Sequence, residues 1–206
     1  MKKLLTLLAL GASIVLAGCS DNSTPVEGKQ YQALPANLST YRLPQVTEVF
    51  SLTCGHCRQM EGELGKIEQL TNQKIGKLHV TFNESAQISA MIYYSAEMQL
   101  AKQPDHDMLA DLFAAVQMGE GATNTERKQA IDKAFESRGL ISPYNLNEEQ
   151  QTQLFKAIHL ADEISTKAEI NAVPTFIVNG KYQVITSGHQ DVDGIANTIN
   201  FLINQQ

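Results

Sequence analysis

Two cysteines separated by two residues are the side chains of this sequence best suited to chemistry. They stand in the segment Cys54-Gly55-His56-Cys57, where a strand-like apolar run meets a helical pattern. Cys54 is therefore expected at a helix N-terminus, where unpaired N–H groups and the helix dipole favour negative charge. A thiolate is the nucleophile of disulfide exchange. We expect Cys54 to be that nucleophile, His56 to offer a donor or cation beside it, and Cys57 to resolve a mixed disulfide.

A zinc site and a purely structural disulfide are the other interpretations of this pair. Structural zinc usually has four ligands, but the sequence has three cysteines and no second Cys-x-x-Cys pair. The remaining histidines are scattered without ligand spacing: His79, His106, His159 and His189. A disulfide across so short a loop restricts the unfolded chain little. We therefore expect a redox-active Cys54–Cys57 disulfide, no metal and no separate cofactor.

Glu48 and Pro174 are weaker signals on their own. Glu48 lies in a strand that otherwise reads as central and buried, where a carboxylate is costly unless it is paired or useful. An edge position, a lysine partner or a proton relay for Cys57 would each explain it. Pro174 stands in the segment Ala172-Val173-Pro174-Thr175, and a proline at the first position of a strand is ordinary structure.

The elements that position these residues follow from apolar spacing and turn signals. Strands are predicted over residues 30–34, 46–50, 77–82, 175–178 and 182–185. Helices are predicted over residues 56–70, 86–103, 107–118, 123–139, 147–167 and 192–202. Thr123 with Glu126 forms a predicted capping box, and Asn179-Gly180 favours a type I′ hairpin turn. The sequence predicts an α/β fold in which residues 29–84 and 165–206 share one sheet and residues 85–164 form an inserted all-helical subdomain.

The first 18 residues have the pattern of an export signal. Two lysines precede the apolar residues 4–16, a run shorter than the roughly 20 residues that span a bilayer. Leu16-Ala17-Gly18-Cys19 resembles the lipobox of bacterial lipoproteins, which implies cleavage before Cys19 and lipidation of its thiol. Residues 19–28 would then be the lipidated cysteine and a flexible tether. The alternative is an ordinary secretory signal cut near Ala17; both readings export the chain.

Composition limits the classes of partner. The 206 residues carry a formal net charge of −6 and are 43% apolar, enough for one well-packed domain. An acidic chain of this kind favours neither nucleic acid nor an anionic membrane surface as a partner. We expect a monomer.

Five segments together resemble the DsbA family of the thioredoxin superfamily over nearly all of the mature region. They are Gly28-Lys29-Gln30-Tyr31, residues 44–51, the Cys54–Cys57 motif, His79-Val80-Thr81-Phe82, and residues 173–183. The resemblance implies a thioredoxin fold carrying a helical insertion. It also implies that Cys54 is the exposed, acidic nucleophile, Cys57 its buried partner and His56 a stabiliser of the thiolate.

The resemblance assigns further roles outside the cysteine motif. Glu48 matches the family's buried glutamate, and Pro174 matches its cis-proline, with the Val173 backbone offered to an extended substrate. The implied activity is donation of the disulfide to unfolded or reduced exported proteins in the periplasm. Reoxidation would come from a quinone-linked membrane oxidase of the DsbB type.

The chain departs from the family in two ways. Gly55 stands where typical DsbA proteins have proline, which gives the Cys-Gly-His-Cys motif of protein disulfide isomerase and suggests a milder oxidant. The lipid anchor at Cys19 would hold the domain at a membrane, whereas typical DsbA proteins are freely soluble in the periplasm.

Two alternative functions use the same residues. The first is a reductase or isomerase of the same fold, although fewer than about 30 residues separate Cys19 from Val46, too few for the dimerisation domain of DsbC-type isomerases. The second is a non-catalytic, lipid-anchored peptide-binding module.

Overall fold

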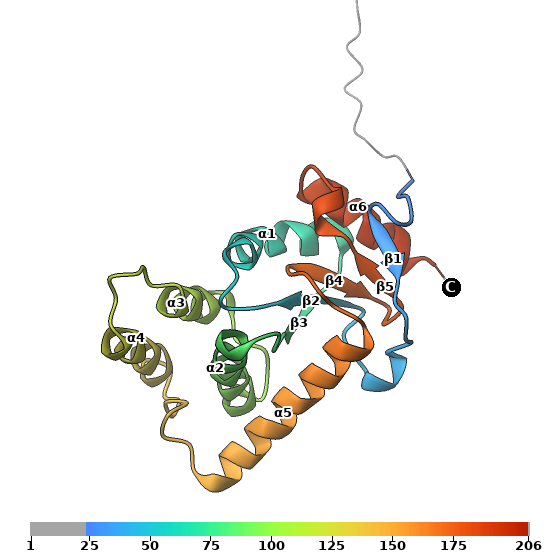
Figure 1. Cartoon of the computed structure of the whole chain (residues 1–206). Coiled ribbons are helices and arrows are strands. Elements are labelled where there is room, and N and C mark those ends of the chain that lie inside the picture. Colours follow the sequence, from blue (N-terminus) through green and yellow to red (C-terminus); the bar gives the residue numbers. More distant parts are fainter. Residues whose placement is uncertain (1–23, 206) are drawn as a thin grey trace, which may run out of the picture.

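A mixed five-stranded sheet lies at the centre of the computed structural model, which describes residues 24–205 (Figure 1). The strands are β1 (Tyr31–Ala33), β2 (Val46–Phe50), β3 (Ile75–His79), β4 (Thr175–Val178) and β5 (Tyr182–Val184). Their order in the sheet is β1-β5-β4-β2-β3. Strand β2 pairs in parallel with β3 and antiparallel with β4. The predicted signal peptide and Cys19 lie outside the described residues.

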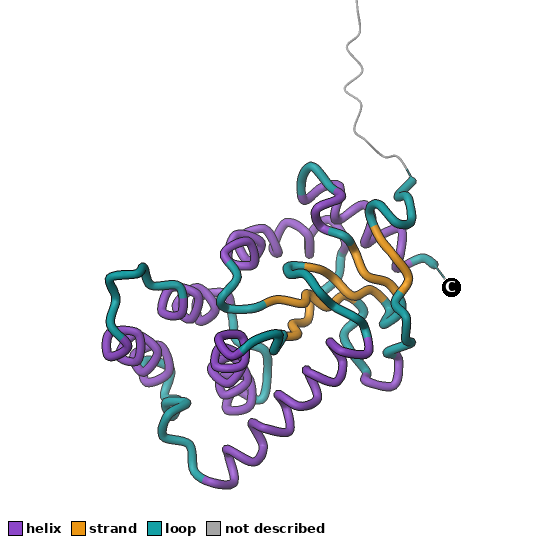
Figure 2. Tube along the Cα trace, in the orientation of Figure 1, coloured by secondary structure: helices purple, strands orange, loops and turns teal. Residues whose placement is uncertain are grey.

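Helices cover both faces of this sheet, as Figure 2 shows. Helices α1 (Gly55–Thr71) and α6 (Val192–Ile203) pack on one face, over a core that includes Ile67, Phe176 and Ile199. Helices α2 (Glu84–Leu100), α3 (His106–Val116), α4 (Asn124–Glu136) and α5 (Glu148–Lys167) follow one another between β3 and β4. These four helices contribute to a second core, on the other face. The predicted α/β architecture is confirmed.

Local signals explain where the inserted helices begin. Thr123 and Glu126 form the predicted capping box at the start of α4, and Asn147 and Gln150 form a second at the start of α5. Each pair satisfies backbone N–H groups that have no partner within the first turn. In the hairpin between β4 and β5, Asn179 and Gly180 both have positive φ, 55° and 62°, as a type I′ turn requires.

The third strand begins and ends earlier than the sequence predicts. It was expected over residues 77–82, but β3 runs over Ile75–His79 and Phe82 is 47% exposed. The strand ends early because β3 is an edge strand and its one partner, β2, ends at Phe50; the last hydrogen bond between them runs from the N–H of Val80 to the carbonyl of Phe50 at 2.9 Å. The backbone groups of His79 point away from β2 and are bound by the hydroxyl of Tyr94 on α2, which lies 2.9 Å from the N–H and 3.3 Å from the carbonyl oxygen.

Aromatic side chains join the inserted helices to the strand that leads into the cysteine motif. The ring of Phe50, at the end of β2, lies 5.1 Å from that of Tyr93 on α2 in an edge-to-face contact. It lies 6.1 Å from the ring of Phe113 on α3. All three side chains are fully buried. The end of β2 is thus fixed by the helical block as well as by the sheet.

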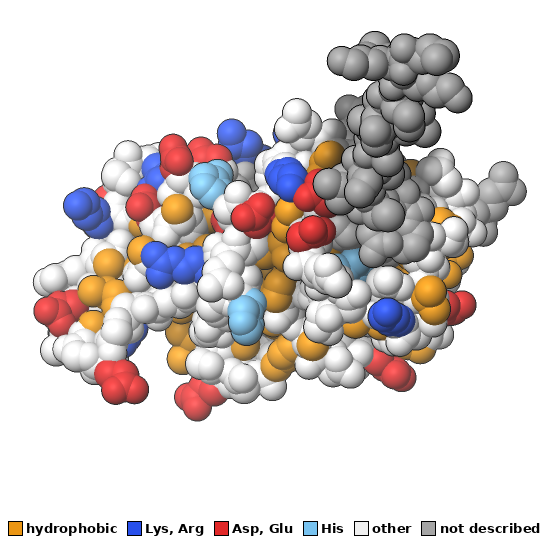
Figure 3. All heavy atoms as spheres, turned by 90° about the horizontal axis from the view of Figure 1, so that it is seen from above, with side chains coloured by type: hydrophobic (Ala, Val, Ile, Leu, Met, Phe, Trp, Pro, Cys, Tyr) orange, Lys and Arg blue, Asp and Glu red, His pale blue; other side chains and the backbone are white. Residues whose placement is uncertain are grey.

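The surface shows no single-sign charge field on the face in Figure 3, where acidic and basic side chains are interspersed. Within residues 24–205, no helix is both long and apolar enough to cross a membrane.

Removing the contact between Phe113 and Phe50 is expected to cause a large loss of stability. Phe113→Ala is expected to lower the free energy of unfolding by about 3–5 kcal/mol, as buried Phe-to-Ala changes do. Phe155→Ala is the matched control, since Phe155 is 55% exposed on α5 and its loss is expected to change stability by less than about 0.5 kcal/mol. Urea unfolding of both variants checks this, and equal effects would contradict it.

Candidate active site

Cys54 is the N-cap of α1, and its sulfur faces the first turn of that helix. The residue has an extended backbone, with φ −89° and ψ 116°, and its Sγ accepts the backbone N–H of Cys57 at 3.1 Å. Cys54 is half-buried, whereas Cys57 is fully buried. An N-terminal turn supplies unpaired N–H groups to whatever atom occupies the cap. Here that atom is the sulfur expected to be the nucleophile.

The loop between β2 and α1 is held by side chains on both sides. The backbone N–H of Leu52 donates to Nε2 of His79 at 2.9 Å. Burial lowers the pKa of His79 to about 3, so the imidazole is neutral and can accept at Nε2 while Nδ1 donates to the carbonyl of Val80 at 2.7 Å. On the other side, Nε2 of Gln117 donates to the carbonyls of Leu52 and Cys54.

The two thiols have opposite acidities. Hydrogen bonding from the Cys57 thiol, against the opposing effect of burial, lowers the pKa of Cys54 to about 6, with the N–H groups of Cys57 and His56 and the charge of His56 contributing. The same thiol–thiol hydrogen bond, together with burial, raises the pKa of Cys57 far above its ordinary value. Cys54 is therefore a thiolate at neutral pH and Cys57 a thiol. His56 itself is exposed beside them.

The Val173–Pro174 segment faces the nucleophile. The Val173–Pro174 peptide bond is cis, and Sγ of Cys54 lies 3.6 Å from the carbonyl oxygen of Val173, to which it donates when it is protonated. Thr186 holds the next carbonyl, because its hydroxyl donates to the carbonyl of Pro174 at 2.7 Å. The structure therefore brings together two segments about 120 residues apart, which the sequence linked only through the family resemblance.

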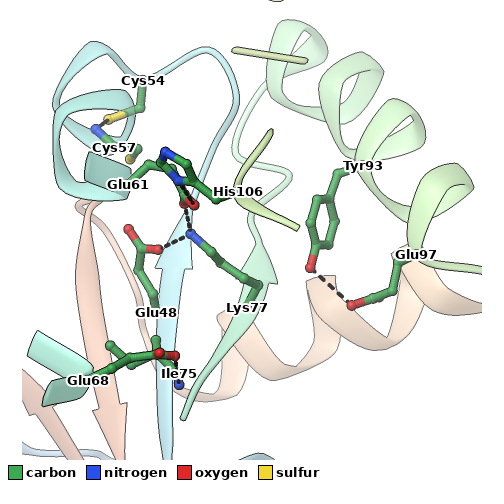
Figure 4. Close-up of polar contacts among 10 residues, drawn as sticks. All are labelled: Glu48, Cys54, Cys57, Glu61, Glu68, Ile75, Lys77, Tyr93, Glu97 and His106. Carbon is green, nitrogen blue, oxygen red and sulfur yellow. Dashed lines mark hydrogen bonds and ion pairs between the residues drawn. The ribbon is translucent and has the colours of Figure 1, made fainter. Parts of the chain in front are cut away.

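A buried charge cluster lies beneath the cysteines (Figure 4). The ammonium group of Lys77 binds Oε2 of Glu48 at 2.5 Å and also binds Oε2 of Glu61. Oε1 of Glu61 pairs in turn with Nδ1 of His106 at 3.2 Å, at the surface. The other oxygen of Glu48, Oε1, is buried without a hydrogen-bond partner. One lysine thus serves two carboxylates and leaves one carboxylate oxygen unsatisfied.

Burial dominates the acidity of Glu48. It raises the pKa of Glu48 to about 7, although the charge and hydrogen bond of Lys77 act in the opposite direction. The carboxylates of Glu48 and Glu61 in turn outweigh burial and raise the pKa of Lys77. Glu48 can therefore exchange a proton near neutral pH, as an acid or base must, and its charge acts on Cys57.

The structure separates the three interpretations of Glu48. The edge position is wrong, because β2 has a neighbour on each side. The lysine partner is present, since Glu48 and Lys77 are directly paired in the parallel register of β2 and β3. The unpartnered oxygen and the raised pKa remain consistent with a proton relay, which stays a prediction.

Sequence reasoning missed Lys77, Glu61, His79 and Gln117. Two of these residues have a recognisable pattern in the sequence. Lys77 is a lone lysine within an apolar strand, and Glu61 follows Cys57 by four residues, which places both on one face of α1. The roles of His79 and Gln117 depend on contacts between distant segments and have no local pattern. Among residues 24–205, no group of three or more His, Cys, Asp or Glu side chains could hold a metal ion.

The fold and this site together define a thiol–disulfide oxidoreductase. A sheet of thioredoxin type presents an acidic, half-exposed cysteine at a helix N-terminus, a buried second cysteine one turn on, and a cis-proline segment opposite.

Comparison with known proteins identifies the family. A thioredoxin family model matches residues 43–200, so the chain belongs to the thioredoxin family. Its relatives among characterised proteins include DsbA proteins. The thiol:disulfide interchange protein DsbA of Salmonella typhimurium is 26% identical over 219 residues and covers all of both chains.

Solved DsbA structures share the fold. Pseudomonas aeruginosa DsbA has a TM-score of 0.65 and 21% identity, covering 89% of this chain and 94% of its own. A Proteus mirabilis DsbA variant with a non-covalently bound peptide has a TM-score of 0.62 and 19% identity, covering 89% and 100%.

The raised pKa of Glu48 predicts a specific dependence of stability on pH. Between its ordinary value of 4.5 and about 7, folded Glu48 holds a proton that the unfolded chain has lost. The contribution of Glu48 to the free energy of unfolding should therefore fall as pH rises through this window, by up to roughly 3 kcal/mol. The buried, neutral His79 contributes a rise up to about pH 6.5, and this rise is shared by the variants compared below. Glu48→Gln is expected to remove this fall, as measured by urea unfolding of the oxidised protein, in which the cysteines do not titrate.

Glu136→Gln is the control for that experiment, because Glu136 is an exposed carboxylate on α4. Its profile should run parallel to that of the unmodified protein. A Glu48→Gln profile that also runs parallel would contradict the assignment of the raised pKa to Glu48.

Proposed function

We propose that this protein is a disulfide donor of the periplasm, which transfers its Cys54–Cys57 disulfide to reduced exported proteins. The observation that supports this direction is the contact of the Cys54 sulfur with the N–H of Cys57 at 3.1 Å. A group that stabilises the thiolate stabilises the reduced form, and a stable reduced form makes the disulfide a stronger oxidant. Each unit by which the pKa falls corresponds to about 30 mV.

The transfer proceeds in two displacements. A substrate thiolate attacks Sγ of Cys54, the Cys54–Cys57 bond breaks, and Cys57 leaves as a thiolate that takes up a proton. A second substrate thiolate then attacks the substrate sulfur of the mixed disulfide and releases Cys54 as a thiolate. The substrate loses two electrons and the protein gains them.

Three neighbouring groups have defined roles in this scheme. Glu48 is the proton donor for the departing Cys57 thiolate, because its pKa of about 7 makes the carboxylic acid available at neutral pH. The exposed His56 adds positive charge near Cys54. The Val173 backbone, 3.6 Å from the nucleophilic sulfur, offers hydrogen bonds to an extended substrate chain. The peptide bound to Proteus mirabilis DsbA supports a peptide-binding surface in this fold.

Reoxidation completes the cycle. We assign it to a quinone-linked membrane oxidase of the DsbB type, which accepts the two electrons through disulfide exchange with Cys54. Lipidation of Cys19 would hold the domain at a membrane and bring its site nearer to a membrane partner. Gly55 in place of proline and a Cys54 pKa of about 6 support a milder oxidant than typical DsbA proteins.

The direction of transfer is tested by the redox potential. The mature protein, equilibrated in glutathione buffers of graded ratio, is expected to show a potential above about −200 mV, towards the roughly −120 mV already known for DsbA. A value near the −270 mV or so known for thioredoxin would instead establish a reductase. Cys54→Ser is expected to abolish oxidation of a reduced, unfolded substrate protein, whereas a peptide-binding module would keep its activity.

The anchor has a separate test. Cys19→Ala in the full-length chain is expected to move the protein from the membrane fraction to the soluble periplasmic fraction, with its redox potential unchanged. A protein already soluble with Cys19 intact would show instead that the signal is an ordinary secretory one.

A further inference from the structure

Gln117 joins the inserted helical block to the active-site loop. It is the C-cap of α3, and its side-chain nitrogen donates to the carbonyl of Leu52 at 2.8 Å and to that of Cys54 at 3.0 Å. Both hydrogens of one amide group are therefore used on the segment that carries the nucleophile. The residue comes from an element more than 60 positions away in the sequence.

These two hydrogen bonds lie beside the sulfur that carries the negative charge of the thiolate. The carbonyl oxygens of Leu52 and Cys54 converge on one nitrogen, so their negative partial charges gather beside the residue that becomes a thiolate. An amide donor placed between them offsets part of that negative charge, and hydrogen bonds of this kind are stronger where water is partly excluded. Without the donor, the carbonyls would oppose the thiolate.

The donor is held firmly in this position. The backbone N–H of Gln117 donates to the carbonyl of Phe113 at 2.9 Å, and Phe113 packs against Phe50 at the end of β2. The guanidinium group of Arg127, on α4, donates to the carbonyls of Val116 at 3.2 Å and Gly119 at 3.0 Å. The turn that carries Gln117 is thus fixed from both sides, which keeps the amide pre-organised.

The same loop is held on its other side by His79, which accepts the N–H of Leu52 at 2.9 Å. Leu52 therefore has both backbone groups bound to side chains, one from β3 and one from α3. This pair of contacts fixes the direction in which the chain enters α1.

We propose that Gln117 is a positioning residue through which the inserted helices stabilise the thiolate form of Cys54. The proposal deepens the proposed function, because it concerns the nucleophile of that reaction. It assigns to the helical block a share in the redox chemistry, besides any part it plays in binding substrate.

Two variants of Gln117 test this. Gln117→Met keeps the length of the side chain but removes both donors, and Gln117→Glu replaces the amide with a carboxylate. The thiolate absorbance of Cys54 in the reduced protein should have its midpoint near pH 6 in the unmodified chain. We expect the thiolate–thiol equilibrium to shift about fivefold towards the thiol in Gln117→Met, a movement of about 0.7 pH unit. The shift should be larger in Gln117→Glu.

The redox potential provides a second measurement. Loss of thiolate stabilisation should lower the equilibrium constant for oxidation of glutathione by about fivefold, or about 20 mV. It should also destabilise the reduced protein more than the oxidised one. A merely structural role would destabilise both forms equally and leave the thiolate midpoint and the potential unchanged, and that result would overturn the proposal.

Gln99→Met is the matched control. Nε2 of Gln99 also donates to two backbone carbonyls, those of Ser95 and Ile141, but both lie within the helical block. The Gln99→Met substitution should lower the free energy of unfolding without moving the pH midpoint of the Cys54 thiolate. Since the midpoint is read on the reduced protein alone, it remains informative even if the unmodified chain turns out to be a reductase.

Discussion

The contact between the Cys54 sulfur and the first turn of α1 is the interaction on which the site depends. A helix N-terminus is normally capped by an oxygen from Ser, Thr, Asp or Asn, and here a sulfur occupies that place at 3.1 Å from the N–H of Cys57. The helix gains a capping partner, and the sulfur gains stabilisation of its negative charge. Anything that alters the direction in which the chain enters α1 therefore alters the chemistry, which explains why His79 and Gln117 bind the short loop before it.

The second organising feature is the unequal burial of the two thiols. Cys54 reaches the surface, while Cys57 is enclosed above the cluster of Glu48, Lys77 and Glu61. A buried ion pair contributes little net stability because its desolvation is costly, and this cluster also leaves one oxygen of Glu48 unsatisfied. This cost in stability has a reason if the cluster donates and accepts the proton of Cys57, a thiol that water cannot reach. The same burial makes Cys57 inert towards outside reagents.

Much of this arrangement could be predicted from local patterns. The strand–helix junction at Cys54, the run of helices after β3 and the Asn179-Gly180 hairpin each have a signal within a few residues, and all are present. The error at β3 arose because its one partner strand, β2, ends at Phe50, so the apolar alternation continues past the last hydrogen bond between the two strands. The ion pair of Lys77 with Glu48 needed the exact register of two strands, and the bonds of Gln117 needed the docking of α3. Such features depend on tertiary packing, which periodicity does not encode.

The pairing of β2 with β4 has a consequence for how the molecule matures. Val46 lies opposite Val178 in that pairing, so the centre of the sheet closes only after the long intervening segment has been made and ordered. Contacts so far apart in the chain slow folding. An export pathway delivers the cysteines first and the Val173–Pro174 segment last. A nascent or truncated chain would therefore lack the completed sheet against which α1 packs, and the helix N-terminus that makes Cys54 acidic would be fully stabilised only after β4 and β5 have joined.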